Sequence, residues 1–133
     1  MSIINTYSGE YFVGIGSGKA PTEEMAIKIA KARALGELAD NIKVTIMSKL
    51  EVISTEITVG DQSQVSESVK EKIISLGNAT VRSPEYEILN VSRRDAEFHA
   101  EVLAKKLIIK HVEESARDLE FNDDIDKILE LIK

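Results

Sequence analysis

The sequence of 133 residues contains no cysteine. Disulfides, thiolate metal ligands and cysteine nucleophiles are therefore excluded. Apolar side chains run continuously for only about three residues, as in Leu107–Ile109, whereas a membrane-spanning helix needs about 20. The N-terminal segment also lacks a basic stretch followed by an apolar one, so the sequence contains no recognisable secretory signal.

Basic residues are in the minority. Lysine and arginine number 17 against 23 acidic residues, which gives a formal net charge of −6. A surface that binds duplex nucleic acid needs an excess of positive charge, so no nucleic-acid partner is expected. The chain does have 43% hydrophobic and 30% charged residues, a composition typical of folded soluble proteins and not of disordered ones.

The length favours one domain, since soluble domains cluster at about 100–150 residues. We expect this domain over residues 1–120, followed by an amphipathic helix over 121–133 that is either part of it or a docking element. If the chain is native and full length, the missing signal predicts a cytoplasmic protein. The alternative is that a signal has been removed from the sequence.

The first third of the sequence predicts a strand, a turn and a helix. A buried strand is expected over Tyr11–Gly16, with Gly16–Gly18 turning the chain out of it. A helix is expected to begin near Ala20–Glu24, because proline fits the first helical turn and glutamates complement the helix dipole there. Asp40–Asn41 predicts its end. Small residues on one helix face would let it lie close to a sheet, namely Ala26, Ala30 and Ala34.

The middle of the chain predicts a second strand and then an ambiguous segment. Apolar residues alternate over Ile42–Val52, which is typical of a strand, and a parity change near Ile53 predicts a bulge or a strand switch. Residues 62–76 fit a helical stripe that ends at Gly77–Asn78, although their serine and β-branched content also suits a strand. We favour the helix.

The last section predicts a hairpin followed by two helices. The hairpin begins at Ser83–Pro84 and turns at Ser92–Asp95, and its second strand alternates from Ala96 to Ala104. Helical spacing follows over Lys105–Leu119 and again near the C-terminus. The order β-α-β-(α)-β-β-α-α predicts an α+β two-layer open sandwich, a mainly antiparallel sheet with helices packed on one face.

The glycine-rich segment is the strongest candidate for a ligand site. It has the form strand, Gly-x-Gly-x-Gly-Lys, helix, and backbone N–H groups at a helix start can bind phosphate. Neither the dinucleotide fingerprint nor the phosphate-binding loop matches, because Lys19 and Ala20 stand where those motifs need other residues. A tight turn is the favoured interpretation, and a small-ligand or anion site is the alternative. Its residues would be Gly14, Gly16, Ser17, Gly18 and Lys19.

No catalytic or metal-binding motif is present. Glu97, His99 and Glu101 would share one strand face, which a metal could use, but a solvated hairpin face is the favoured interpretation. His111 is expected on a helix surface. A cluster of aspartates lacks the glycine and glutamate of a calcium loop and suits helix capping instead; these are Asp123, Asp124 and Asp126. We therefore expect no catalytic residues, no metal, no cofactor and no enzyme activity.

Two surface features bear on partners. A group of basic residues could meet an anionic partner, but without interleaved aromatics a solvated turn is favoured; it comprises Arg82, Arg93, Arg94 and Lys105–Lys106. The C-terminal segment is more apolar than a solvated helix requires, so it either packs back on the sheet or docks another subunit or protein. This makes a protein partner or self-association expected. The apolar stripe consists of Ile125, Ile128, Leu129 and Ile132, with Leu131 beside it.

A family resemblance covers roughly residues 9–112. Its residues are Tyr11–Ser17, Ala26, Ala30, Ala34–Leu35, Leu38–Ala39, Ile42, Val44–Ser48, Tyr86–Leu89 and Phe98–Val102. In these positions the chain resembles the twenty-kilodalton outer-membrane lipoprotein family, a domain type also found at the N-terminus of flagellar assembly protein T.

The resemblance implies an α/β open sandwich in the bacterial cell envelope, in the periplasm or at the outer membrane. It implies a structural or protein-interaction role and no enzyme activity, and it offers no functional residues to transfer. Family members attach to the membrane through a lipidated N-terminal cysteine. This chain has no cysteine, so that anchor is absent from it.

Overall fold

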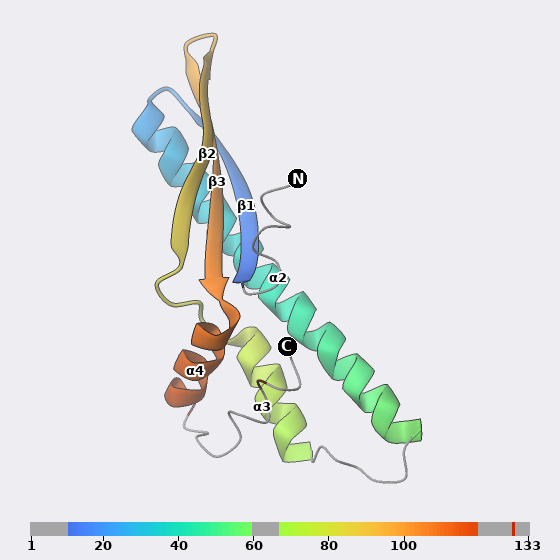
Figure 1. Cartoon of the computed structure of the whole chain (residues 1–133). Helices are drawn as coiled ribbons and strands as arrows, with labels where there is room; N and C mark the ends of the chain where they lie inside the picture. The colour runs from blue at the N-terminus through green and yellow to red at the C-terminus, as the bar shows by residue number, and fades with distance from the viewer. Residues whose placement is uncertain (1–10, 60–66, 120–128, 130–133) are drawn as a thin grey trace. The chain divides into compact units, whose positions relative to one another are not determined.

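The computed structural model describes residues 11–59, 67–119 and 129 (Figure 1). Three strands form an antiparallel sheet in the order β1-β3-β2, and helices accompany it, so the predicted α+β class is confirmed. The element order of the described chain is β-α-α-β-β-α, which has one strand fewer than expected. The elements are β1 (Tyr11–Ala20), α2 (Glu23–Val59), α3 (Glu67–Asn78), β2 (Glu85–Arg94), β3 (Glu97–Leu107) and α4 (Ile108–Asp118).

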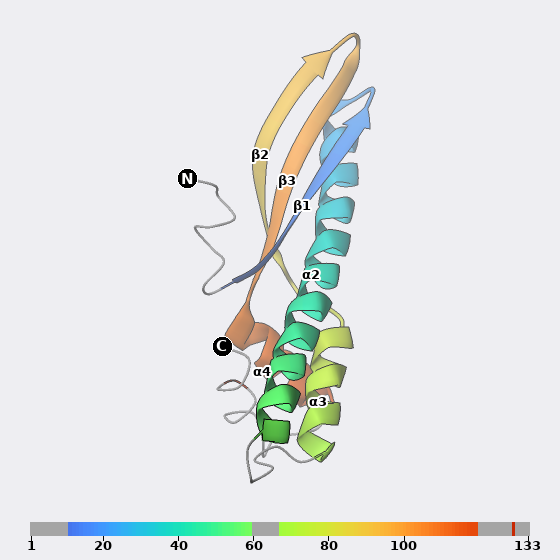
Figure 2. The same cartoon turned by 90° about the vertical axis from the view of Figure 1, so that its right-hand side faces the viewer.

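The chain divides into two compact units. The sheet unit comprises Met1–Asn41 and Val81–Ile108, and the helical unit comprises Ile42–Thr80 and Ile109–Lys133. Helix α2 contributes its first part to the sheet unit and its second part to the helical unit. Within the sheet unit α2 lies along one face of the sheet, so this unit has two layers (Figure 2).

The packing of β1 on α2 explains the glycine-rich segment. A Cβ atom built on Gly14 would lie 2.7 Å from the backbone oxygen of Ala34, and one built on Gly18 would lie 2.6 Å from the backbone nitrogen of Ala30. Gly16 meets the backbone of α2 between them. Ordinary Cβ atoms do not approach backbone this closely, so the strand can lie at this distance from the helix only because glycine has no Cβ.

The predicted turn at Gly16–Gly18 is wrong. β1 continues to Ala20, and no glycine in the described part of the chain has a positive φ. The glycines serve close approach and not a change of direction. The predicted helix face of Ala26, Ala30 and Ala34 is confirmed, because all three are fully buried opposite the glycines.

The spacings of the two elements match. Two residues of strand advance by about 6.7 Å, and four residues of helix advance by about 6 Å. Glycines at every second strand position therefore meet small residues at every fourth helix position over several steps. This match lets Gly14, Gly16 and Gly18 all contact the same helix at backbone distance.

The helix end predicted at Asp40–Asn41 and the strand predicted over Ile42–Val52 are both wrong. α2 continues to Val59. The alternating pattern misled because Ile42 and Ile46 are four residues apart, a spacing that fits the period of two of a strand and also one turn of a helix. Both are buried, whereas Val44 between them is 63% exposed, which is a helical pattern and not a strand pattern.

The hairpin β2–β3 is confirmed, but its turn is Asp95–Ala96 and not the predicted Ser92–Asp95, because β2 stays paired with β3 up to Arg94. Both turn residues have positive φ, 48° and 68°, as a two-residue type I′ turn requires. The register shifts between Ile88 and Asn90, which leaves Leu89 as the extra residue of a bulge. β3 extends to Leu107, so the helix expected from Lys105 begins only at Ile108.

In the helical unit the favoured helix is confirmed over Glu67–Asn78, where Ile73 and Leu76 are fully buried. The prediction that His111 lies on a helix surface is wrong, because the residue is only 1% exposed. Its ring Nε2 lies 3.0 Å from the carbonyl oxygen of Leu76. A carbonyl can only accept, so Nε2 carries the proton.

The remaining expectations for this unit fall mostly outside the described residues. They include residues 62–66 and 120–128 and the apolar positions Ile128 and Ile132. Of the predicted C-terminal stripe only Leu129 is described; it is helical and 9% exposed.

Candidate functional site

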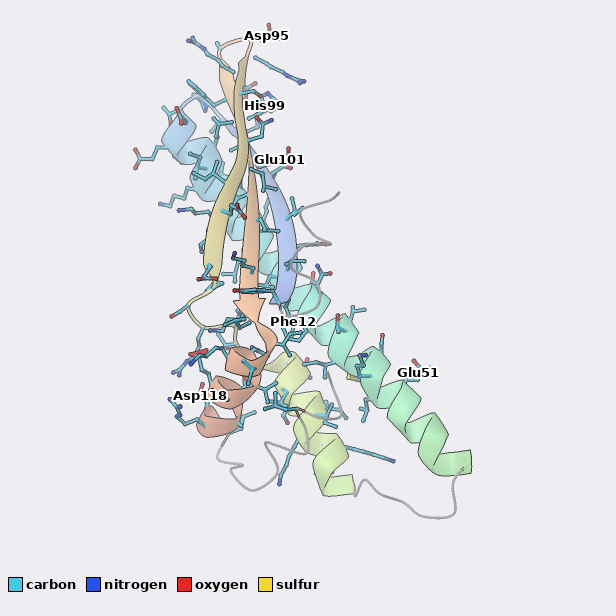
Figure 3. The ribbon with its side chains drawn as sticks, viewed as in Figure 1. Phe12, Glu51, Asp95, His99, Glu101 and Asp118 are labelled. Carbon is cyan, nitrogen blue, oxygen red and sulfur yellow. The ribbon has the colours of Figure 1, made fainter. Side chains whose placement is uncertain are left out.

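α2 covers one face of the sheet, and the opposite face, called the open face below, is exposed toward the hairpin end. Farther from the hairpin tip, Leu103 on that opposite face is fully buried. Side chains alternate along β1, so that Phe12 and Ala20 are buried toward α2 while Ser17 and Lys19 are exposed on the opposite side. Cross-strand pairing places Glu101 beside Ser17 and His99 beside Lys19 on that open face. Figure 3 shows His99 and Glu101 along β3 below the hairpin tip at Asp95.

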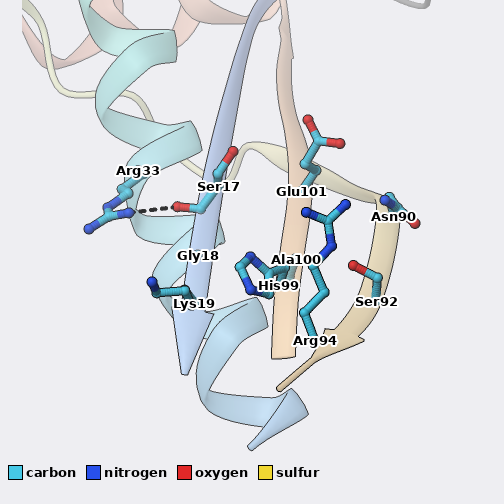
Figure 4. A pocket seen from close by; sticks show the side chains of 10 residues that line it. All are labelled: Ser17, Gly18, Lys19, Arg33, Asn90, Ser92, Arg94, His99, Ala100 and Glu101. Atoms are coloured by element: carbon cyan, nitrogen blue, oxygen red, sulfur yellow. Dashed lines mark hydrogen bonds between the residues drawn. The ribbon is translucent and has the colours of Figure 1, made fainter. Parts of the chain in front are cut away.

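A recess of about 270 Å³ lies on the open face toward the hairpin end of the sheet (Figure 4). All three strands and the first part of α2 contribute to it, and all of its residues belong to the sheet unit. Its lining is mainly polar: Ser17, Gly18, Lys19, Arg33, Asn90, Ser92, Arg94, His99, Ala100 and Glu101.

Positive charge dominates this recess although the chain as a whole is acidic. Among the described lining residues, Lys19, Arg33 and Arg94 supply three cationic groups and Glu101 supplies one carboxylate. Hydroxyl and amide side chains from β1 and β2 also line the recess, namely those of Ser17, Ser92 and Asn90. Ammonium and guanidinium groups combined with hydroxyl donors suit an oxyanion, which accepts hydrogen bonds from all of them.

Arg33 is held in place at the rim. Its guanidinium donates to the backbone carbonyl of Ser17 at 2.9 Å, across the outer edge of β1 (Figure 4). This bond uses one of the five guanidinium N–H groups. The remaining donors extend from a side chain whose position the strand backbone sets.

Of the predicted glycine-segment site, Ser17, Gly18 and Lys19 line the recess. Gly14 and Gly16 do not; the face that their missing side chains leave open is filled by α2. The site therefore uses the end of this segment from the opposite side of the sheet, through strand side chains and not through a loop backbone.

The predicted basic group does not form one cluster. Arg94 lines the recess, whereas the Arg93 guanidinium carbon lies 5.7 Å from the ring centre of Phe98 on the covered face. Lys105 stacks over Tyr11 at 5.0 Å. Lys106 is buried and donates to the carbonyl of Arg82. Strand alternation disperses residues that are neighbours in the sequence.

Three residues of the recess were not predicted from the sequence, namely Arg33, Asn90 and Ser92. Arg33 belongs to a helix that the sequence places next to β1, but its reach around the strand edge depends on the close packing of the two backbones. Asn90 and Ser92 join the open face because the bulge at Leu89 changes the parity of β2. Without that bulge their side chains would fall on the covered face.

His99 and Glu101 share the open face, as their spacing predicted, and Glu97 has the same parity. In the part of the chain that the structure describes, no group of three or more histidine or acidic side chains is arranged to hold a metal ion. Likewise, no hydrogen bond joins the imidazole of His99 to the hydroxyl of Ser17 or Ser92 among the described residues.

The helical unit has a second, more apolar hollow of about 600 Å³ along α2. Val44 and Met47 line it and are 63% and 39% exposed. All of its described lining residues come from one helix, and among them no polar groups from different elements converge to orient a ligand. Among the described helices, none combines the length and the apolar character needed to cross a membrane.

No family model matches this chain, and no curated protein is significantly similar to it.

Proposed function

We propose that this chain is a non-enzymatic binding domain whose open-face recess holds an oxyanion, either a carboxylate or a phosphate, of the molecule that it binds. The observation that carries the proposal is that Lys19, Arg33 and Arg94 all line one recess in a chain of net charge −6. Such a local excess of positive charge attracts an anion by charge-assisted hydrogen bonds.

The contacts within the recess support binding in preference to covalent chemistry. A serine nucleophile needs a base within hydrogen-bond reach, and the hydroxyls of Ser17 and Ser92 make no such bond to His99 in the described chain. Donors for an anion are present without any further rearrangement of the backbone.

We also propose a place in the bacterial cell envelope, on the basis of the resemblance to the outer-membrane lipoprotein family. The residues that carry this resemblance include Tyr11–Ser17 and the alanines at positions 26, 30 and 34, which pack the strand against the helix. They describe a way of packing, so the family likeness supports a structural or protein-interaction role and not a particular reaction.

The anion site can be tested by following the backbone amide resonances of Ser17, Ser92 and His99 while inorganic phosphate or acetate is added. We expect both anions to shift these resonances, and Lys19→Ala to weaken phosphate binding by about three- to tenfold. Lys28→Ala is the matched control, because Lys28 is exposed on α2 outside the recess.

Comparison of the two anions shows whether carboxylate or phosphate is preferred. Absence of any shift at high concentrations of both would refute the anion site. An equal loss in Lys19→Ala and Lys28→Ala would show that only overall charge matters.

A further inference from the structure

The two edge strands of the sheet differ in how the chain covers them. At the outer edge of β1, side chains of α2 donate to two backbone carbonyls: Asn41 to Val13 at 2.8 Å and Arg33 to Ser17 at 2.9 Å. At the outer edge of β2 (Glu85–Arg94), the described residues make no hydrogen bond. An uncovered edge strand presents a row of unpaired N–H and C=O groups to any strand that can pair with it.

The pairing pattern identifies which groups of β2 point outward. Val13 and Ser17 direct their carbonyls away from β3, so the glycines between them hydrogen-bond to β3. Successive residues of β3 direct their backbone hydrogen bonds alternately to β1 and to β2. Leu103 and Glu101 are therefore among the residues of β3 that hydrogen-bond to β2. The residues of β2 left with outward backbone groups are Tyr86, Ile88, Val91 and Arg93.

These outward positions also carry exposed apolar side chains. Tyr86 is 38% exposed and Ile88 is 52% exposed. Charges flank them with opposite sign at the two ends of the strand. Glu85 and Glu87 lie at its beginning, and Arg93 and Arg94 lie at its end.

We propose that β2 pairs antiparallel with β2 of a second copy of this chain, around a two-fold axis between Leu89 and Asn90. An antiparallel arrangement is self-complementary, because the acidic beginning of each strand lies beside the basic end of the other. The two sheets then continue into one another through the new strand pair.

One register satisfies side chains and backbone together. It sets Tyr86 opposite Arg93 of the second copy and Ile88 opposite its Val91. All four residues have backbone groups that point away from β3, and their side chains are on the α2 side of the sheet. On the open face Glu85 lies opposite Arg94. Paired residues of an antiparallel ladder must share a face, and this register meets that condition because the bulge changes the parity of β2 halfway along.

Charge disfavours parallel pairing of the two strands in register. Parallel pairing of two β2 strands in register would set Glu85 against Glu85 and Arg94 against Arg94. Like charges directly opposite each other destabilise a strand pair. Charged residues ordinarily protect an edge strand from association. Here their distribution favours antiparallel pairing with a second copy of β2.

Self-association is measured by sedimentation equilibrium across a range of protein concentrations at low and high salt. We expect the mass to rise from 14.7 kDa toward twice that value, with weaker association in high salt because the end charges are exposed. Amide hydrogen exchange gives the register. The N–H groups of Tyr86, Ile88, Val91 and Arg93 should gain protection with concentration, while those of Glu87 and Ser92 should not change.

Two sets of variants locate the contact. Ile88→Pro removes an outward N–H that β3 does not use, so it should abolish association and leave the sheet intact; Ile88→Val is its matched control. Glu85→Arg and Arg94→Glu should each weaken association about tenfold, and the double variant should restore it. The charge variants decide the question if the circular dichroism spectrum shows that Ile88→Pro does not fold.

A mass that stays monomeric at every concentration would overturn the proposal, as would association that neither set of variants changes. Protection of the outward amides at all concentrations would also overturn it, since another segment of the same chain would then cover the edge. Arg94 also lines the recess, so Ile88→Pro and Glu85→Arg give the readouts that are independent of the anion site. Lys19→Ala tests that site without altering β2.

Discussion

Asn41 of α2 donates its side-chain amide to the backbone carbonyl of Val13 in β1 at 2.8 Å. In the sequence, Asp40–Asn41 has the character of a helix end, because asparagine competes with helical hydrogen bonds. In the structure this side chain is instead engaged with the outer edge of β1, and the helix continues through it. The residue that resembles the end of one element in fact connects two.

Replacing Asn41 therefore tests the covering of the β1 edge. We expect Asn41→Ala to lower the free energy of unfolding by about 1 kcal/mol, the usual net value of one hydrogen bond. Urea denaturation measures the change. Asp40→Ala is the control, since Asp40 is exposed and should change stability by less than about 0.5 kcal/mol. An equal effect of both variants would count against the role of the Asn41 amide.

The closeness of β1 and α2 predicts opposite effects of the same substitution at two glycines. Gly16→Ala would place a Cβ against the backbone of Ala30 and Ala34, which cannot move aside without displacing the helix. We expect it to cost about 1–3 kcal/mol or more of unfolding free energy.

Gly36→Ala is the matched variant, because the methyl group that it adds on the exposed side of α2 would have no atom within 4 Å. Alanine suits a helix interior better than glycine, so we expect a gain of about 0.5–1 kcal/mol. Chemical denaturation of both proteins decides the matter. A neutral Gly16→Ala would show that strand and helix are not in backbone contact.

The hairpin turn predicts a stabilising substitution. Ala96 has φ of 68°, a conformation that a residue with a Cβ adopts at a cost. Ala96→Gly should raise the free energy of unfolding by about 0.5–1 kcal/mol, measured from the thermal midpoint. Ala32→Gly, on the exposed side of α2, should instead lower stability by about 1 kcal/mol. A loss of stability in both would contradict the turn geometry.

His111 predicts a sensitive point in the helical unit. The ring is buried, and its N–H donates to the carbonyl of Leu76, which also accepts a long bond of 3.4 Å from the Ala79 amide. His111→Ala removes a hydrogen bond and leaves a cavity, so we expect a loss of about 2–4 kcal/mol.

The neighbouring Lys110 is exposed, and Lys110→Ala should change the stability by less than about 0.5 kcal/mol. Hydrogen exchange in α3 and α4 reports whether the loss in His111→Ala falls on the helical unit. If His111→Ala is as stable as Lys110→Ala, the buried hydrogen bond does not contribute to folding.

Predictions from the sequence are correct where a pattern is local. The alternation from Ala96 to Ala104 predicted a strand with one buried face, and the polar turn before it predicted a hairpin. The exception is Leu103, which the alternation places toward water and which is fully buried. The prediction is wrong over Ile42–Val52, where apolar residues fit both periods of two and of four. Burial of Ile46 and exposure of Val44 separate the alternatives, and burial depends on neighbours that are distant in the sequence.

The candidate site shows the same division. Ser17 and Lys19 are candidates from their place beside the glycines, and both line the recess. The sequence indicates Arg94 only as one member of a basic group. Its separation from Arg93 follows from the alternation of side chains along a strand. A bulge that no residue type announces decides that Arg94, and not Arg93, is on the face with the recess.

The sequence by itself determined the α+β class, the hairpin and the small-residue face of the first long helix, because each depends on spacings within one segment. Tertiary structure alone decided that α2 runs unbroken past Asn41, that His111 is buried and that basic residues from separate elements line one recess. The physical reason is that hydrogen-bond partners and burial are supplied by backbone and side chains from other parts of the chain, whose approach the spacing within a segment does not encode.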